Sequence, residues 1–161
     1  MTATKKSIRF LTSLFLVFTM VFFIVSVPVS AAGVENWYAG NSYSYIYENE
    51  FTIRGYNLTP VKTCYGTGVM NINVEILQIL DSASNSNPIN FTIQICSTSG
   101  AVLSGFTANS ADFKNGFPHG LWTSCNISNG QKIQIYIGAY DAITGNYRTV
   151  RLKYGHCFIG S

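Results

Sequence analysis

The alternating stretch Met70-Asn71-Ile72-Asn73-Val74-Glu75-Ile76 decides the fold class of this 161-residue chain. Apolar and polar residues take turns along it with a period of two, which is typical of a β-strand with one buried face. The stretch Ile89-Asn90-Phe91-Thr92-Ile93-Gln94-Ile95 repeats this pattern after a segment of turn-forming residues. We therefore predict a hairpin in which Ile76 faces Ile89.

A second hairpin is predicted near the end of the chain. It consists of Ile133-Gln134-Ile135-Tyr136-Ile137 and Val150-Arg151-Leu152-Lys153-Tyr154, which repeat the first two stretches in the same phase and at one constant separation. If Tyr140 faces Tyr147 across the turn, every inward position pairs two apolar residues, and Tyr136 lies opposite Arg151, where a cation–π contact is expected.

The four cysteines follow the same separation. The step from Cys64 to Cys125 equals the step from Cys96 to Cys157, and it also relates the two predicted hairpins. An even number of cysteines in an exported protein indicates disulfides. The spacing favours Cys64–Cys96 with Cys125–Cys157, and the nested arrangement Cys64–Cys157 with Cys96–Cys125 is the alternative. A zinc site is less favoured, because zinc ligands usually come in close pairs and no two cysteines are near each other in the sequence.

These patterns contain no convincing helix. They predict an antiparallel β-sandwich of about eight strands, stabilised by disulfides. Two similar halves are expected, residues 36–96 and 97–157, with a Greek-key barrel as the alternative architecture. Upstream of the hairpins, Tyr43, Tyr45 and Tyr47 share one face of a further strand. We expect these three rings to be buried against the sandwich.

Residues 1–31 have the features of an export signal. Three basic residues are followed by a long apolar run and by a small-residue cleavage pattern that ends at Ala31. We predict that this segment is removed, that residues 32–161 form a single domain without a transmembrane segment, and that the protein is secreted. An uncleaved membrane anchor is the alternative.

Charge argues against nucleic acid as a partner. Lys5, Lys6 and Arg9 account for the net charge of +3, and the remaining part of the chain has seven basic and seven acidic residues. Binding to a phosphate backbone depends on a surplus of positive charge. The predicted mature protein lacks that surplus.

The search for catalytic motifs is negative. Neither histidine lies in a zinc-protease motif, and the G-x-S-x-G pattern is absent. His119 and Asp112 form a triad only if a serine joins them. Asp81, Asn85 and Asn87 lack the glycine and the terminal glutamate of a calcium loop. We therefore predict no catalytic residues, no metal site and no cofactor.

The outward faces of the two predicted hairpins differ. The first presents small polar side chains, whereas the second presents aromatic and basic ones. The predicted ligand-binding residues on the second face are Lys132, Gln134, Tyr136, Tyr140, Tyr147, Arg151 and Lys153. Flat aromatic rings with polar neighbours are suited to stacking on sugars or to lying at a membrane interface.

Three functions follow from these features. The favoured one is a secreted, non-enzymatic binding module for a glycan, a cell-wall component or another surface ligand. The alternative is a secreted toxin or antimicrobial protein that acts on membranes. A hydrolase that uses His119 ranks third.

Overall fold

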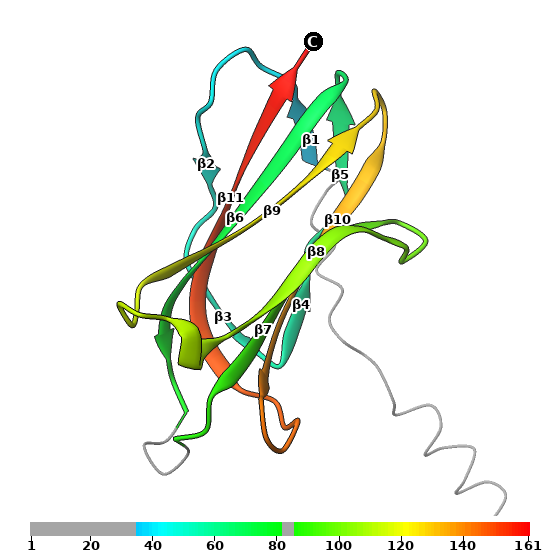
Figure 1. Cartoon of the computed structure of the whole chain (residues 1–161). Coiled ribbons are helices and arrows are strands. Elements are labelled where there is room, and N and C mark those ends of the chain that lie inside the picture. Colours follow the sequence, from blue (N-terminus) through cyan, green and yellow to red (C-terminus); the bar gives the residue numbers. More distant parts are fainter. Residues whose placement is uncertain (1–34, 82–85) are drawn as a thin grey trace, which may run out of the picture. The chain divides into compact units, whose positions relative to one another are not determined.

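The computed structural model describes residues 35–81 and 86–161 (Figure 1). Within these ranges the chain forms eleven strands and one 3-10 helix, Ser110–Asp112. The strands are β1 Glu35–Tyr38, β2 Ile46–Tyr47, β3 Phe51–Arg54, β4 Tyr56–Leu58, β5 Lys62–Tyr65, β6 Gly68–Ile79, β7 Ile89–Ser97, β8 Val102–Asn109, β9 His119–Ile127, β10 Lys132–Asp141 and β11 Thr149–Gly160. The predicted export segment lies outside the described residues. Within the described part, no helix is long and apolar enough to span a membrane.

The strands form two sheets. Sheet A has the order β1-β5-β10-β7-β8, with β4 also paired to β10. Sheet B has the order β2-β11-β6-β9, with β3 also paired to β11. The predicted all-β class is confirmed, and two separate sheets favour a sandwich over the Greek-key barrel. The expectation of antiparallel pairing is wrong for β1, which runs parallel to β5.

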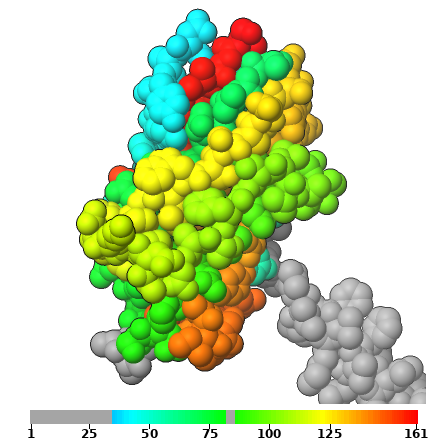
Figure 2. All heavy atoms as spheres, in the orientation of Figure 1, coloured from blue at the N-terminus to red at the C-terminus, as the bar shows by residue number. Residues whose placement is uncertain are grey.

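The outermost strands β8 and β9 belong to different sheets and contact each other along one side of the molecule. Figure 2 shows this side, where the segments of β8 and β9 lie next to each other in green-yellow and yellow. The Ser104 hydroxyl on β8 and the Thr123 hydroxyl on β9 are hydrogen-bonded at 3.0 Å. The side chains of the two sheets therefore meet along this side.

The core lies between the two sheets. The alternating residues of β6 and β10 turn inward, and Ile72, Val74, Ile133 and Ile135 are all fully buried in one hydrophobic cluster. Burying a side chain of this size contributes about 1.5–3 kcal/mol. The predicted inward faces of these strands are confirmed.

Both predicted hairpins are wrong. β6 lies in sheet B and β7 in sheet A, and likewise β10 lies in sheet A and β11 in sheet B. Ile76 is therefore paired with Leu152 of β11 and not with Ile89. Ile137 is paired with Ile93 of β7 and not with Val150. Each connecting loop crosses from one sheet to the other.

The reason is that a period of two identifies the buried face of a strand but not its neighbour. Two strands that pair side by side and two strands that face each other across a core both bring apolar residues together. The predicted register survives only at the turn, where Tyr140 and Tyr147 form an isolated antiparallel bridge.

The strand pairings are similar in the two halves of the sequence that are related by a constant separation. β6 pairs with β9 and β11, and β10 pairs with β5 and β7. A shift along the chain by the step from Cys64 to Cys125 maps β5, β6 and β7 onto β9, β10 and β11 and exchanges the two sheets. The pair Lys132–Thr63 corresponds in this way to the pair Asn71–Ser124. A duplication of the halves 36–96 and 97–157 remains a prediction.

The predicted disulfides are not formed in this structure, in which all four cysteines are free. Cys64 and Cys125 point into the core cluster, whereas Cys96 and Cys157 lie outside it. Cys96 is paired with Gln134 on sheet A, and the Cys157 thiol lies 3.9 Å from the Ser42 carbonyl oxygen. Both predicted arrangements would join an inward cysteine to an outward one, so the sheets keep the partners apart.

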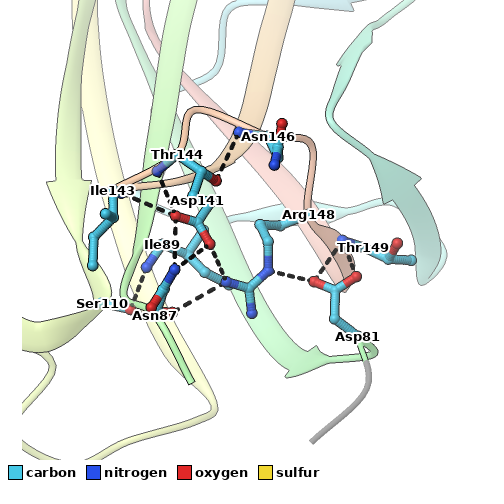
Figure 3. A network of polar contacts seen from close by, with 10 residues as sticks. All are labelled: Asp81, Asn87, Ile89, Ser110, Asp141, Ile143, Thr144, Asn146, Arg148 and Thr149. Atoms are coloured by element: carbon cyan, nitrogen blue, oxygen red, sulfur yellow. Dashed lines mark hydrogen bonds and ion pairs between the residues drawn. The ribbon is translucent and has the colours of Figure 1, made fainter. Parts of the chain in front are cut away.

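A buried polar network holds the two crossing loops together (Figure 3). The Arg148 guanidinium donates to the Asp81 carboxylate at 2.6 Å and to the Asp141 carboxylate at 3.3 Å. Arg148 also donates to the Asn87 carbonyl oxygen at 3.1 Å, and the Asn87 amide donates to Asp141. The network therefore links the end of β6, the start of β7 and the turn between β10 and β11.

Candidate functional site

Four tyrosine rings gather on the outer face of sheet A. Tyr136 and Tyr140 come from β10, Tyr56 comes from β4, and Tyr147 comes from the turn before β11. We call these four residues the tyrosine cluster. Ring centroids lie 5.9 Å apart for Tyr56 and Tyr136, 6.3 Å for Tyr56 and Tyr147, and 5.6 Å for Tyr140 and Tyr147.

Gly138 lies at the centre of the cluster and leaves room for the contact of two rings. Residues four apart on a strand are separated by about 13 Å along the backbone, yet the hydroxyls of Tyr136 and Tyr140 are hydrogen-bonded at 2.6 Å. The two side chains meet above Gly138. A Cβ atom at this position would lie 2.7 Å from Tyr140 Cε2 and 3.0 Å from the Tyr136 hydroxyl. Any larger residue would separate the rings.

A second glycine brings Tyr56 and Tyr147 to the cluster. Gly55 has a φ of +83°, a conformation that glycine adopts without strain. Its N–H donates to the Arg148 carbonyl and its own carbonyl accepts from Ala139 N–H. The chain thereby turns from β3 in sheet B to β4 in sheet A. The Tyr147 ring lies against Gly55, where a Cβ atom would come within 2.6 Å of it.

The cluster combines two exposed rings with a Tyr136 phenol that stays neutral. Tyr56 is 46% exposed and Tyr147 is 57% exposed, whereas Tyr136 and Tyr140 are half-buried. Burial and the hydrogen bond to Tyr140 raise the pKa of Tyr136. The Tyr136 phenol is therefore uncharged at neutral pH. Its hydroxyl is a hydrogen-bonding group and not a nucleophile.

Amide and hydroxyl side chains border the cluster on β7 and β8. Tyr136 lies opposite Gln94, Gly138 opposite Thr92 and Tyr140 opposite Asn90. Thr92 is hydrogen-bonded to Thr107 at 2.9 Å, and the Asn109 amide donates to Asn90 at 2.9 Å. The outer face of sheet A thus places aromatic rings beside uncharged donors and acceptors.

The structure divides the seven predicted binding residues between the two sheets. Lys132, Gln134, Tyr136 and Tyr140 lie on β10, and Tyr147 is bridged to it. Arg151 and Lys153 lie on β11 in sheet B. The predicted contact of Tyr136 with Arg151 is therefore wrong, because their strands belong to different sheets.

Three of the four polar members of the predicted set have protein partners. The Gln134 side chain donates to the Thr59 carbonyl at 2.9 Å. The Arg151 side chain lies 3.9 Å from the Glu50 carboxylate, and Lys153 lies 3.0 Å from the Glu75 carboxylate. Lys132 is exposed at the start of β10. Only the three tyrosines of the predicted set come together, and Tyr56 is the member that sequence reasoning missed.

His119, the basis of the third predicted function, stacks on the Phe113 ring with a centroid distance of 3.8 Å. Asp112 lies in the 3-10 helix next to Phe113. Over the described ranges, no hydrogen bond joins His119 to Asp112 or to a serine. The arrangement of base and orienting carboxylate that a triad needs is not formed by these side chains.

The other histidine is buried beside a core residue. The His156 ring stacks on Trp37 with a centroid distance of 3.8 Å. Lys62 lies 5.3 Å from the Trp37 ring centroid and forms an ion pair with Glu35. Burial and the nearby Lys62 ammonium lower the pKa of His156 to about 4. These contacts hold β1 against β5 of sheet A through Lys62 and against β11 of sheet B through His156.

Metal ligands do not gather in the described residues. No group of three His, Cys, Asp or Glu side chains lies close enough together there to hold an ion.

Comparison with known proteins identifies no family. No family model matches the chain, and no curated protein matches it. Among solved structures, a β-glucosidase from Paenibacillus barengoltzii is similar over 80% of this chain, with 15% sequence identity and a TM-score of 0.33. The match spans 12% of that enzyme's chain. Similarity at this level carries no argument about function.

Proposed function

We propose that the protein is secreted and binds a carbohydrate through the tyrosine cluster, without catalysing a reaction. The observation that carries this proposal is the meeting of four tyrosine rings from three chain segments, with Gly138 leaving room for their contact. If tyrosine occurred here only because it favours strands, no glycine would be needed between Tyr136 and Tyr140. Here the glycine costs strand stability and creates an aromatic surface.

The chemistry of the surface suits an uncharged sugar. A pyranose ring presents C–H groups on its faces and hydroxyls at its edge. Exposed rings such as Tyr56 and Tyr147 offer apolar contact to the faces. The hydroxyls and amides of Tyr140, Gln94 and Thr92 offer donors and acceptors to the edge. Sugars with mainly equatorial hydroxyls, as in β-linked glucans and chitin-like chains, have the flattest faces and are the favoured ligands.

Binding without catalysis is supported by the side chains around the cluster. The hydroxyls of Tyr136 and Tyr140 are hydrogen-bonded to each other. His119 is stacked on Phe113 and forms no link to Asp112 among the described residues. Glycoside hydrolysis uses a pair of carboxyl groups across the scissile bond, and the cluster consists of tyrosines.

Binding of neutral oligosaccharides to the purified protein tests the proposal. Glucose-based and N-acetylglucosamine-based oligomers, both β-linked, are compared with α-linked glucose oligomers by calorimetry. We expect Tyr56→Ala and Tyr147→Ala each to weaken binding of the β-linked oligomers by about tenfold, which corresponds to about 1.4 kcal/mol. Tyr38→Ala is the matched control, because Tyr38 is also exposed on sheet A but stacks on Tyr65 outside the cluster.

Undiminished binding in both cluster variants would remove the tyrosine cluster as the site. Leakage from phospholipid vesicles, without binding to any oligosaccharide, would instead support the membrane-active alternative.

A further inference from the structure

The outer face of sheet B carries a second aromatic surface. The strand registers place Trp122 of β9 opposite Asn73 of β6, Asn73 opposite Gly155 of β11, and Gly155 opposite Tyr47 of β2. These four residues form one row across the whole sheet. An indole ring and a phenol ring thus flank a central amide.

Trp122 is the most exposed large ring of β9. Its neighbours Leu121 and Thr123 turn inward, whereas Trp122 is 60% exposed. The ring leans over Gly120, where a Cβ atom would lie 2.9 Å from two atoms of the indole. Strand β9 runs across the surface that Figure 2 shows. A large apolar ring is thereby held at the surface by a glycine, as in the tyrosine cluster.

Tyr47 reaches the same row from the other edge of the sheet. Its ring crosses Gly155, where a Cβ atom would lie 2.8 Å from Tyr47 Cδ1. Its hydroxyl accepts a hydrogen bond from the Asn73 side-chain amide at 2.8 Å. The expectation that Tyr43, Tyr45 and Tyr47 are buried is wrong: Tyr43 is 69% and Tyr47 44% exposed, and Tyr45 is half-buried.

Asn73 has an amide atom that no protein group satisfies. The residue is 7% exposed, and its Oδ1 atom has no hydrogen-bond partner. Exchanging the nitrogen and oxygen positions would let Oδ1 accept from Tyr47 and would leave Nδ2 unpaired instead. Either orientation leaves one buried polar atom of Asn73 without a protein partner, which lowers the stability of the fold.

The charges beside the row cancel. The Lys153 ammonium lies 3.0 Å from the Glu75 carboxylate and 5.1 Å from the Tyr47 ring centroid. An ammonium group has three N–H donors, and Glu75 uses one of them. The next ion pair, Arg151–Glu50, is also neutral overall. An uncharged ligand rich in hydroxyls fits these groups better than an anion or a cation.

We propose that Trp122, Asn73 and Tyr47 form a second carbohydrate-binding site, on the face of sheet B opposite to the tyrosine cluster. The sugar ring stacks on Trp122, and a sugar hydroxyl pairs with the unsatisfied amide atom of Asn73 once the rings beside it shift, because that atom has almost no exposed surface in the unbound protein. The contacts that form this site involve no residue of the tyrosine cluster. The two outer faces point in opposite directions, because the sheets share one core. With the proposed function of the tyrosine cluster, the protein is bivalent and cross-links glycan chains.

Tryptophan fluorescence reports on this site alone. The chain has two tryptophans, of which Trp37 is buried against His156 and the tyrosine cluster has none. Titration with β-linked oligomers of glucose or N-acetylglucosamine is expected to change the fluorescence of the natural protein and of Tyr56→Ala. Trp122→Ala is expected to abolish this change. Ile143→Ala, an exposed position outside both sites, is the control.

Calorimetry with the same short oligomers counts the sites. We expect two per chain in the natural protein, one in Trp122→Ala, and one in Tyr56→Ala. A soluble β-linked polysaccharide is expected to be precipitated by the natural protein and by neither variant. Trp122→Phe, which keeps an aromatic ring, is expected to restore part of the binding lost in Trp122→Ala.

The outcomes separate the two proposals. A single site that is lost in Tyr56→Ala, with no fluorescence change, would overturn the second site and leave the proposed function standing. A single site that is lost in Trp122→Ala would support the sheet B site and overturn the tyrosine cluster. The absence of any saccharide binding would overturn both.

Discussion

Tyr140 and Tyr147 face each other in an antiparallel bridge at the point where their strands part for different sheets. The residues that follow them, Asp141 and Arg148, are both buried and lie 3.3 Å apart in an ion pair. On each side of the turn, therefore, a tyrosine on the outer face is followed directly by a charged side chain in the interior. The tyrosine cluster and the polar network of Figure 3 are therefore built on the same turn.

The ion pairs of Arg148 are expected to contribute strongly to stability. Arg148→Met leaves the buried Asp141 carboxylate without this cation, and we expect the free energy of unfolding to fall by about 3–5 kcal/mol. Arg151→Met is the matched control, because its ion pair with Glu50 is exposed and 3.9 Å long, so a loss of at most about 1 kcal/mol is expected. Urea unfolding measures both, and equal losses would contradict the prediction.

Gly138 is expected to be required for the tyrosine cluster. In Gly138→Ala the new methyl group would occupy the space of Tyr140 Cε2, 2.7 Å away. The rings must move apart, so we expect saccharide binding to the cluster to weaken by about tenfold. Gly40→Ala serves as the control, because no atom lies within 4 Å of a Cβ there. Unchanged binding in Gly138→Ala would show that the contact of Tyr136 with Tyr140 is unimportant.

His156 is expected to make the protein less stable in mild acid. Its pKa is lowered to about 4 in the folded protein, from 6.5 in the unfolded chain. Below pH 6.5 the unfolded chain takes up a proton that the folded protein does not bind. The free energy of unfolding is therefore highest above pH 6.5 and falls as the pH decreases toward 4, by up to about 3 kcal/mol.

The variant His156→Phe tests this dependence, because it keeps a ring for stacking on Trp37 and removes the titrating group. We expect its unfolding free energy to change less between pH 6.5 and pH 4 than that of the natural protein. Parallel curves for the two proteins would assign the dependence to other groups.

The cysteines are expected to be thiols that react only after unfolding. Burial and the nearby Cys125 thiol raise the pKa of Cys64 to about 11, and burial also raises the pKa of Cys96 and Cys125. Thiolates are the reactive form. We expect four thiols to react with an aromatic disulfide reagent in denaturant, and slow reaction in its absence. A gain in mass on reduction of the unfolded protein would instead reveal a disulfide.

The period of two in the sequence was sufficient to predict the all-β class and the inward faces of β6 and β10. It was not sufficient to predict which strands are neighbours, since Ile76 finds equally apolar partners in Ile89 and in Leu152. The disulfide prediction rested on the equal spacing of the cysteines, which does not show on which side of a sheet each cysteine lies. The sheets place Cys64 inside and Cys96 outside.

The candidate sites were predicted only where one strand carries them. Tyr136, Tyr140 and Tyr147 were found because they occupy outward positions of one predicted hairpin, whose turn register at Tyr140 and Tyr147 is confirmed. Tyr56 and Trp122 join their surfaces through strand pairings that no local pattern indicates. Glycine at an outward strand position beside an aromatic residue, as at Gly138 and Gly120, is the one sequence signal that both surfaces share.

The placement of β11 bears on how the chain folds. This last strand pairs with β2, β3 and β6 and so occupies the middle of sheet B. Because β6 does not pair with β7 and β10 does not pair with β11, sheet B is complete only when the C-terminal strand arrives. Proteins dominated by such distant contacts fold slowly, on a scale of about milliseconds to seconds. A chain cut after Asp141 would stay unfolded, and refolding after denaturation should be a late, all-or-none event.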